Sequence, residues 1–212
     1  VDLRDFLSGD PVRKQKFVNE IGKAYEDIGF VALKGHFLDD QLVDELYSEI
    51  RNFFALPLET KYSYEIEGLG GQRGYVSFGK EHAKGKKEGD LKEFWQIGQY
   101  VEGEVMPKAD YPDNMDVSEL EGFADVGKDL YKSFEKAGSH LLRAIANYLD
   151  IDENYFAPKI KNGNSILRAI HYPPITNEPK TAIRAEQHED INLITLLVGA
   201  SADGLQLLTR EG

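Results

Sequence analysis

Residues 188–198 have the sequence HEDINLITLLV, and this stretch decides how the chain is interpreted. An apolar run rich in β-branched and aliphatic residues follows His188-Glu189-Asp190, and turn-forming residues follow at 199–204. Such a run predicts a buried β-strand over 191–198. Side chains two residues apart in a strand point to the same face, with Cα atoms roughly 6.5 Å apart. We therefore expect His188 and Asp190 to reach one point at the rim of a sheet.

The His188–Asp190 spacing is suited to binding a metal. An imidazole nitrogen and a carboxylate oxygen are two of the three ligands in the 2-His-1-carboxylate triad that holds non-haem Fe(II). The pattern is short, and a surface histidine and aspartate at a strand end would also produce it. Asn192 is predicted on the same strand face, either as a hydrogen-bond donor to a ligand carboxylate or as an ordinary strand residue.

The composition is typical of a globular protein. The chain has 212 residues, of which 41% are hydrophobic and 29% charged, enough for one domain or slightly more. It contains no cysteine, which excludes disulfides, zinc–thiolate sites and cysteine nucleophiles and is consistent with a cytoplasmic location. No apolar stretch approaches the roughly 20 residues needed to cross a bilayer. The net charge of −12 argues against a nucleic acid or an anionic membrane as partner.

Three helices are predicted from periodic apolar residues. The first covers 11–29 with Ser8 or Asp10 as its cap, and the second begins at Asp39 or Asp40 and is stopped by Pro57. The third and longest covers 118–150, where two internal glycines are expected to bend or interrupt it.

Strands are predicted at 30–33, 94–101, 166–172, 191–198 and 204–208, and 61–92 is expected to be mostly loop. Helices followed by a run of strands indicate an α+β fold, a sheet or barrel with a helical flank. Because the chain starts without methionine and stops after an apparent strand, we expect it to be part of a longer protein.

Seven segments in the same order resemble the 2-oxoglutarate- and Fe(II)-dependent dioxygenases of the isopenicillin-N-synthase-like group. They are GFVALKGH at 29–36 (with Gly and His transposed relative to the usual pattern), FFALPLETK at 53–61, RGY at 73–75, DLKEF at 90–94, LRAIHYPP at 167–174, HED at 188–190 and DGLQ at 203–206. Each segment is weak evidence alone, but seven in register favour the metal-ligand interpretation of His188 and Asp190.

The resemblance implies a double-stranded β-helix (jelly roll) core behind an N-terminal helical region. Its domains would be 1–110, the N-terminal helical and mixed region, and 111–212, the long helix with the first part of the jelly roll. The C-terminal part of that core would be missing from this chain. The resemblance further implies Fe(II) as cofactor, with 2-oxoglutarate and O₂ as cosubstrates. The third ligand, a distal histidine, and the arginine–serine pair that binds 2-oxoglutarate are expected beyond Gly212.

Three further residues are candidates for binding substrate or cosubstrate. Tyr172 matches the family tyrosine that contacts a carboxylate, although it is also compatible with a packing role. Arg168 lies four residues earlier on the same predicted strand face and would add positive charge for an acid, or is a surface arginine. Tyr75 is expected to line the substrate pocket.

The resemblance implies an enzyme that oxidises a C–H bond of a small molecule by hydroxylation, desaturation or cyclisation, with release of succinate and CO₂. Two alternatives stay open: an Fe(II) oxidase of the same fold that uses no 2-oxoglutarate, and a non-catalytic jelly-roll binding module. The identity of the substrate and the oligomeric state do not follow from the sequence.

Overall fold

The computed structural model describes residues 1–82, 89–107, 111–176, 182–185, 187–198 and 203–208. The chain divides into two compact units. We call Val1–Leu38, Ser133–Lys161 and Asn192–Gly212 the helical unit, and Asp39–Lys132 with Asn162–Ile191 the sheet unit. Both units contain residues from before and after position 110, and the predicted domain boundary at 110/111 stays a prediction for the complete fold.

The helical unit begins with α1 (Leu3–Phe6) and α2 (Pro11–Asp27) and also contains α6 (Ala157–Ile160). Helix α2 starts where the sequence predicts, because the Asp10 carboxylate accepts a hydrogen bond from the Val12 backbone N–H at 2.8 Å. Helix α5 (Phe123–Tyr148) supplies its C-terminal half to this unit. It is one continuous helix of 26 residues, so the expected interruption by glycine does not occur.

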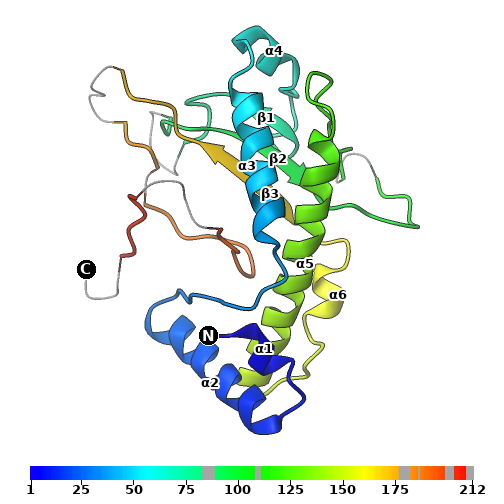
Figure 1. The fold of residues 1–212 in the computed structure, drawn as a ribbon, viewed down its shortest axis with the longest axis vertical. Coiled ribbons are helices and arrows are strands. Elements are labelled where there is room, and N and C mark those ends of the chain that lie inside the picture. The colour runs from blue at the N-terminus through cyan, green and yellow to red at the C-terminus, as the bar shows by residue number, and fades with distance from the viewer. Residues whose placement is uncertain (83–88, 108–110, 177–181, 186, 199–202, 209–212) are drawn as a thin grey trace. The chain divides into compact units, whose positions relative to one another are not determined.

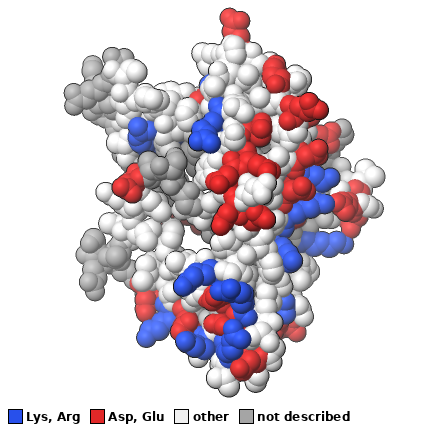
Figure 2. Space-filling model, viewed as in Figure 1, with Lys and Arg blue, Asp and Glu red and all other residues white. Residues whose placement is uncertain are grey.

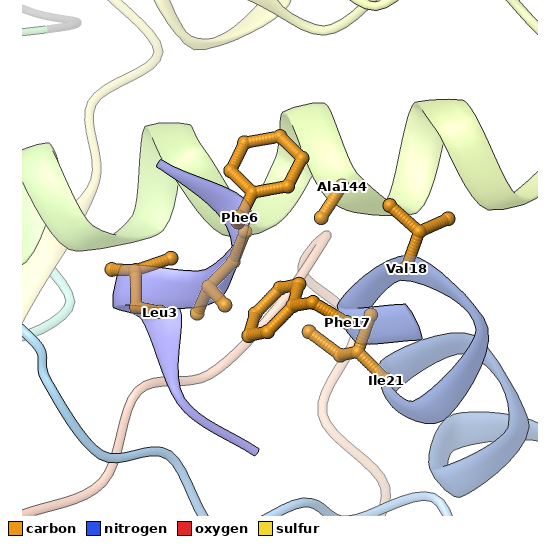
Figure 3. Close-up of a cluster of buried hydrophobic side chains, with 7 residues drawn as sticks. Leu3, Phe6, Phe17, Val18, Ile21 and Ala144 are labelled. Carbon is orange, nitrogen blue, oxygen red and sulfur yellow. The ribbon is translucent and has the colours of Figure 1, made fainter. Parts of the chain in front are cut away.

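Apolar side chains from α1, α2 and α5 form the core of the helical unit. Figure 3 shows side chains of α1 and α2 directed toward Ala144 of α5. The buried members are Leu3, Phe6, Phe17, Val18, Ile21, Leu141 and Ala144. On α2, Ile21 lies four residues after Phe17 and three after Val18, so the three side chains share one helical face, as in an amphipathic helix.

The sheet unit combines α3 (Asp40–Phe54) and α4 (Leu58–Ser63) with a three-stranded antiparallel sheet (Figure 1). Its strands are β1 (Gly74–Val76), β2 (Glu93–Gly98) and β3 (Ile166–His171), with β2 in the middle. The register pairs Tyr75 with Trp95 and Trp95 with Ala169. The predicted loop at 61–92 therefore contains a helix end and a strand, and its residues 83–88 lie outside the described part.

An aromatic core fills the space between α3 and one face of this sheet. Phe53 of α3 lies 4.7 Å from Trp95 of β2, centroid to centroid, and Trp95 lies 5.2 Å from Phe123 of α5. All three side chains are fully buried. Because Trp95 and Glu93 alternate with Phe94 and Gln96 along β2, the two sets occupy opposite faces of the sheet.

Three predicted strands are wrong within the described residues. Segment 30–33 forms no strand, and a single parallel bridge joins Asp2 to Lys34 beside it. Segments 191–198 and 204–208 are also irregular in their described residues. The physical reason is that a strand needs a neighbouring strand for its backbone N–H and C=O groups, and a suitable apolar pattern does not supply that neighbour.

The charged side chains are unevenly distributed. Figure 2 shows Asp and Glu side chains predominating around α3 and Lys and Arg side chains around α1 and α2. Several of these basic groups have acidic partners within the helical unit, including Arg13 with Asp5 at 2.5 Å and Lys14 with Glu153 at 2.7 Å. Within the part of the chain that the structure describes, no helix combines the length and the apolar character required to span a bilayer.

Candidate metal and substrate site

His188 and Asp190 lie close together although their segment is not a strand. The His188 Nε2 and Asp190 Oδ1 atoms are 3.5 Å apart. Both side chains are about half exposed, at 59% and 47%. The predicted juxtaposition of the two groups is therefore present, while the strand geometry from which it was predicted is not.

The two donor atoms fit a shared divalent cation. Two ligands about 2.1 Å from one octahedral ion at a right angle are roughly 3 Å apart, close to the observed separation. The donor set, one neutral nitrogen and one anionic oxygen, also suits Fe(II). Among the described residues, no group of three or more His, Cys, Asp and Glu side chains is arranged to hold a metal. The third ligand beyond Gly212 stays a prediction.

Two other histidines have contacts of their own. His140 packs against the Phe37 ring in the helical unit, with centroids 5.4 Å apart. Burial first, and then the nearby Arg143 and Lys136 charges, lower the pKa of His140. His171 stacks on Phe54 and lies 2.8 Å from a Glu93 oxygen through its Nδ1.

Strand β3 presents its residues alternately to the two sides of the sheet. Burial along β3 alternates between exposed and intermediate from Ile166 to His171. Arg168 shares the more exposed set with Ile170, and His171 belongs to the other set and contacts α3. Tyr172 follows directly after the strand and is 39% exposed. The alternation therefore supports the predicted common face of Arg168 and Tyr172.

Arg168 is already paired with a carboxylate. Its Nη1 atom lies 3.0 Å and 3.2 Å from the two carboxylate oxygens of Glu81. Its guanidinium also lies 4.3 Å from the Phe94 ring centroid on β2. Glu81 therefore neutralises Arg168 within the described residues, and the expected contribution of Arg168 to binding an acid stays a prediction.

Tyr75 is part of the core, with an exposure of 1%. Its hydroxyl donates a hydrogen bond to the Glu93 carboxylate. Burial first, and then this hydrogen bond, raise the pKa of Tyr75. In the described structure Tyr75 thus contacts the Glu93 carboxylate, and its place at the substrate pocket stays a prediction.

Glu93 accepts hydrogen bonds from three elements. Lys61 of α4 donates to it at 2.9 Å, Tyr75 donates from β1, and His171 donates its Nδ1–H from β3. Burial by itself would raise the pKa of Glu93, but these hydrogen bonds and the Lys61 charge outweigh it and hold the pKa below the ordinary value. Glu93 is therefore a buried, ionised carboxylate.

Asn192 belongs to the helical unit. Its side-chain Nδ2 donates to the Thr195 hydroxyl at 3.1 Å. The predicted hydrogen bond to a ligand carboxylate is not among the contacts described for it and stays a prediction.

Two charged residues of the sheet unit were not predicted from the sequence. Arg184 lies over the Tyr172 ring, with the guanidinium carbon 5.8 Å from the ring centroid, and its Nη1 donates to the Pro173 carbonyl at 3.4 Å. Glu81 binds Arg168 and Lys92. The sequence evidence for a functional role of Arg184 was weak: the residue lies four positions before His188. No local pattern distinguishes Glu81 from the other acidic residues of its segment.

Comparison with known proteins places this geometry in a family. Residues 1–119 match the family described as the N-terminal part of non-haem dioxygenases in morphine synthesis. The proline hydroxylase buaE of Petromyces alliaceus is 31% identical over 221 residues, an alignment that covers 100% of this chain and 68% of that protein. The 2-oxoglutarate-dependent dioxygenase frbA of a Dothideomycetidae species is 29% identical, with 100% and 65% covered.

Solved structures of the same family resemble this chain as well. A 2OG-Fe(II) oxygenase family protein from Caulobacter crescentus superposes with a TM-score of 0.72 at 36% identity, covering 86% of this chain and 58% of that one. A Neurospora crassa protein solved with α-ketoglutarate and thymine gives a TM-score of 0.67 at 27% identity, with 82% and 54% covered. The chain thus spans about two thirds of the length of these curated relatives and little more than half of these solved ones. It belongs to the non-haem, 2-oxoglutarate- and Fe(II)-dependent dioxygenase family.

Proposed function

We propose that the protein containing this chain is an Fe(II)- and 2-oxoglutarate-dependent oxygenase that oxidises a C–H bond of a small molecule. In a hydroxylation, O₂ and 2-oxoglutarate are consumed, one oxygen atom enters the substrate, and the other enters succinate as CO₂ is released. The observation that carries the proposal is the 3.5 Å separation of His188 Nε2 and Asp190 Oδ1 in a chain of this family.

Five residues have a role in this proposal. His188 and Asp190 hold the metal together with a distal histidine beyond Gly212, and bound Fe(II) supplies open positions for 2-oxoglutarate and O₂. The Tyr172 hydroxyl donates a hydrogen bond to a carboxylate of cosubstrate or substrate. Arg184, held over the Tyr172 ring, adds positive charge beside that carboxylate. Arg168 contacts the substrate from the same face of the sheet as Tyr172.

The complete fold in this proposal is a jelly roll. The antiparallel sheet and the helices of the described residues fit an α+β architecture. Double-stranded β-helix cores bind ligands at their mouths, and a site there would be reached by the exposed face of β3. The cytoplasmic location, the small-molecule substrate and the absence of nucleic-acid and membrane partners stay predictions.

Succinate formation tests the function directly. The full-length protein is incubated with Fe(II), 2-oxoglutarate, O₂ and candidate substrates, and succinate is measured. We expect His188→Ala and Asp190→Ala to abolish turnover while circular dichroism stays that of the parent protein, because each change removes a metal ligand from an exposed segment. The buffer omits small carboxylates, which can replace the missing Asp190 ligand. Undiminished activity of Asp190→Ala would contradict the proposal.

A further inference from the structure

Arg168 is held in one orientation by three neighbours. Glu81 accepts two contacts from Nη1, Gln96 Oε1 accepts one from Nε at 3.4 Å, and the Phe94 ring lies against the guanidinium. Gln96 and Arg168 are direct cross-strand partners in the register of β2 and β3. A guanidinium stacked on an aromatic ring and bonded at its edges has little freedom to turn toward another partner.

Glu81 has a second positive partner. Lys92 Nζ lies 2.7 Å from Glu81 Oε2 and 2.9 Å from Asp90 Oδ2, and the side chains of Lys92 and Asp90 are buried. Burial alone would raise the pKa of Glu81, but Lys92 and Arg168 outweigh it and hold the pKa below its ordinary value. The four charges alternate in sign and sum to zero. This face of the sheet therefore offers a fixed, neutralised guanidinium.

One edge of Arg168 is available to a ligand. Among the described residues its Nη2 atom forms no hydrogen bond, and the side chain is 36% exposed. A carbonyl or amide oxygen can accept from Nη2 without adding charge. A carboxylate would instead bring a second negative charge next to Glu81, and like charges in a partly buried site repel strongly.

We propose that Glu81 is a specificity-determining residue, which occupies Arg168 and makes the position next to Arg168 favour uncharged substrate groups that accept hydrogen bonds over carboxylates. This inference rests on the proposed function, in which Arg168 faces the substrate. The substrates expected at that position carry an uncharged acceptor group, such as an amide or a ring carbonyl. The discrimination is achieved by repulsion of the wrong ligand more than by attraction of the right one.

Acetate and acetamide are suitable probes because they have nearly the same shape and differ in charge. The full-length protein, loaded with Zn(II) so that its NMR signals stay sharp, is titrated with each probe. The Arg168 Nε–H signal, assigned by its absence in Arg168→Lys, reports binding. In the parent protein we expect a response at lower acetamide than acetate concentration. In Glu81→Gln we expect the acetate dissociation constant to fall about tenfold and that of acetamide to change less than about twofold.

Two controls separate this effect from general ones. Glu20→Gln removes the same charge from an exposed site of the other unit, where Glu20 pairs with Lys16 at 3.7 Å, and should leave both affinities unchanged. Lys92 keeps Asp90 as partner in Glu81→Gln, so this variant is expected to fold. If circular dichroism shows that Glu81→Gln does not fold, the Glu81→Ser variant is measured instead.

An acetate affinity that is the same, or too weak to measure, in both the parent and the Glu81 variant would overturn the inference. The succinate assay is run with Fe(II) on samples of the same proteins to which neither Zn(II) nor a probe has been added. Succinate formation without the acetate effect would reject the role of Glu81 alone. The acetate effect without succinate formation would support the pairing of Glu81 with Arg168 and reject the proposed function.

Discussion

Glu93 is a single carboxylate that joins a helix to three strands of the sheet unit. Lys61 comes from α4, Tyr75 from β1 and His171 from β3, and all three donate hydrogen bonds to it. His171 is held on the helix-covered face, and the strand alternation, continued by one residue, would turn Tyr172 toward the opposite face. A buried ion pair of this kind contributes specificity of arrangement more than net stability.

Replacing Tyr172 by phenylalanine tests the role of its hydroxyl. We expect Tyr172→Phe to weaken binding of 2-oxoglutarate or of the substrate by roughly 1–2 kcal/mol, about 5- to 30-fold in KM, because one hydrogen bond to a charged group is lost while the ring beneath Arg184 is kept. Michaelis constants for both compounds are compared with those of Tyr155→Phe, an exposed tyrosine of the helical unit. Identical constants in all three proteins would mean that Tyr172 only packs.

At the scale of elements, α2 and α5 pack through a glycine and an ion-pair cluster. Gly22 lies against the Tyr148 ring so closely that a Cβ atom there would be 2.1 Å from ring carbons. The Tyr148 hydroxyl donates to Glu26 one turn further along α2, at 2.8 Å. The ring is therefore fixed at both ends of its contact with α2 and has little room to move away.

Alanine substitutions at two helical glycines should have opposite effects. Gly22→Ala is expected to lower the free energy of unfolding by about 1–3 kcal/mol, because the overlap with Tyr148 exceeds the gain in helix propensity. Gly138→Ala in α5 is expected to raise it by up to about 1 kcal/mol, since a Cβ there would lie 3.4 Å from a Leu196 methyl carbon. Urea denaturation measures both. A Gly22→Ala protein as stable as the parent would show that the Tyr148 ring can move away and make room for the new Cβ atom.

Glu153 connects the same two helices and makes their packing dependent on pH. It accepts hydrogen bonds from Lys14 of α2 at 2.7 Å, and from Arg143 at 2.8 Å and Asn147 at 3.1 Å on α5. The Lys14 hydrogen bond is the largest cause that lowers the pKa of Glu153 from 4.5 to about 2. A carboxyl group whose pKa is lower in the folded state than in the unfolded state stabilises the folded state at pH values above its unfolded-state pKa. This stabilisation is lost as the pH falls through the folded-state pKa.

Glu153→Gln should therefore be destabilising at neutral pH and nearly silent in acid. We expect a loss of about 1–2 kcal/mol at pH 7, less than full linkage would give because Lys14 and Arg143 are partly exposed to water. The difference from the parent should shrink as pH falls from 4.5 toward 2. Urea denaturation across this range measures it, with Glu20→Gln as the exposed control. A difference that is independent of pH would exclude the ionised pair as its source.

Across the described residues of the whole chain, two proposed metal ligands, His188 and Asp190, lie close together. A facial triad needs three, and two ligands alone hold Fe(II) weakly and without selectivity. The chain covers 68% of the curated relative buaE, so the relative has sequence outside the alignment in which a third ligand can lie. The histidine expected beyond Gly212 stays a prediction.

Residues 1–212 expressed alone should form no competent catalyst. We expect no succinate from 2-oxoglutarate under Fe(II) and O₂, and weaker Fe(II) binding than in the full-length protein, because the proposed third ligand is not among these residues. The apolar side chains exposed at Ile191, Leu193 and Leu197 should also favour aggregation. Light scattering and the succinate assay compare the two proteins. Equal specific activity would place the third ligand within this sequence.

Local sequence patterns predicted the three longest helices and two of the strands, and the H-x-D spacing predicted that His188 and Asp190 lie close together. Helices α2, α3 and α5 and strands β2 and β3 follow from periodicity, caps and breakers, since the hydrogen bonds of a helix join residues four apart. Tertiary structure alone decided that 191–198 is no strand, that Tyr75 is buried on Glu93, and that Glu81 neutralises Arg168. Strand pairing and charge neutralisation depend on groups that are far apart in the chain; Arg168 and Glu81, for example, are 87 residues apart. A local sequence pattern therefore does not specify which distant residue becomes the partner.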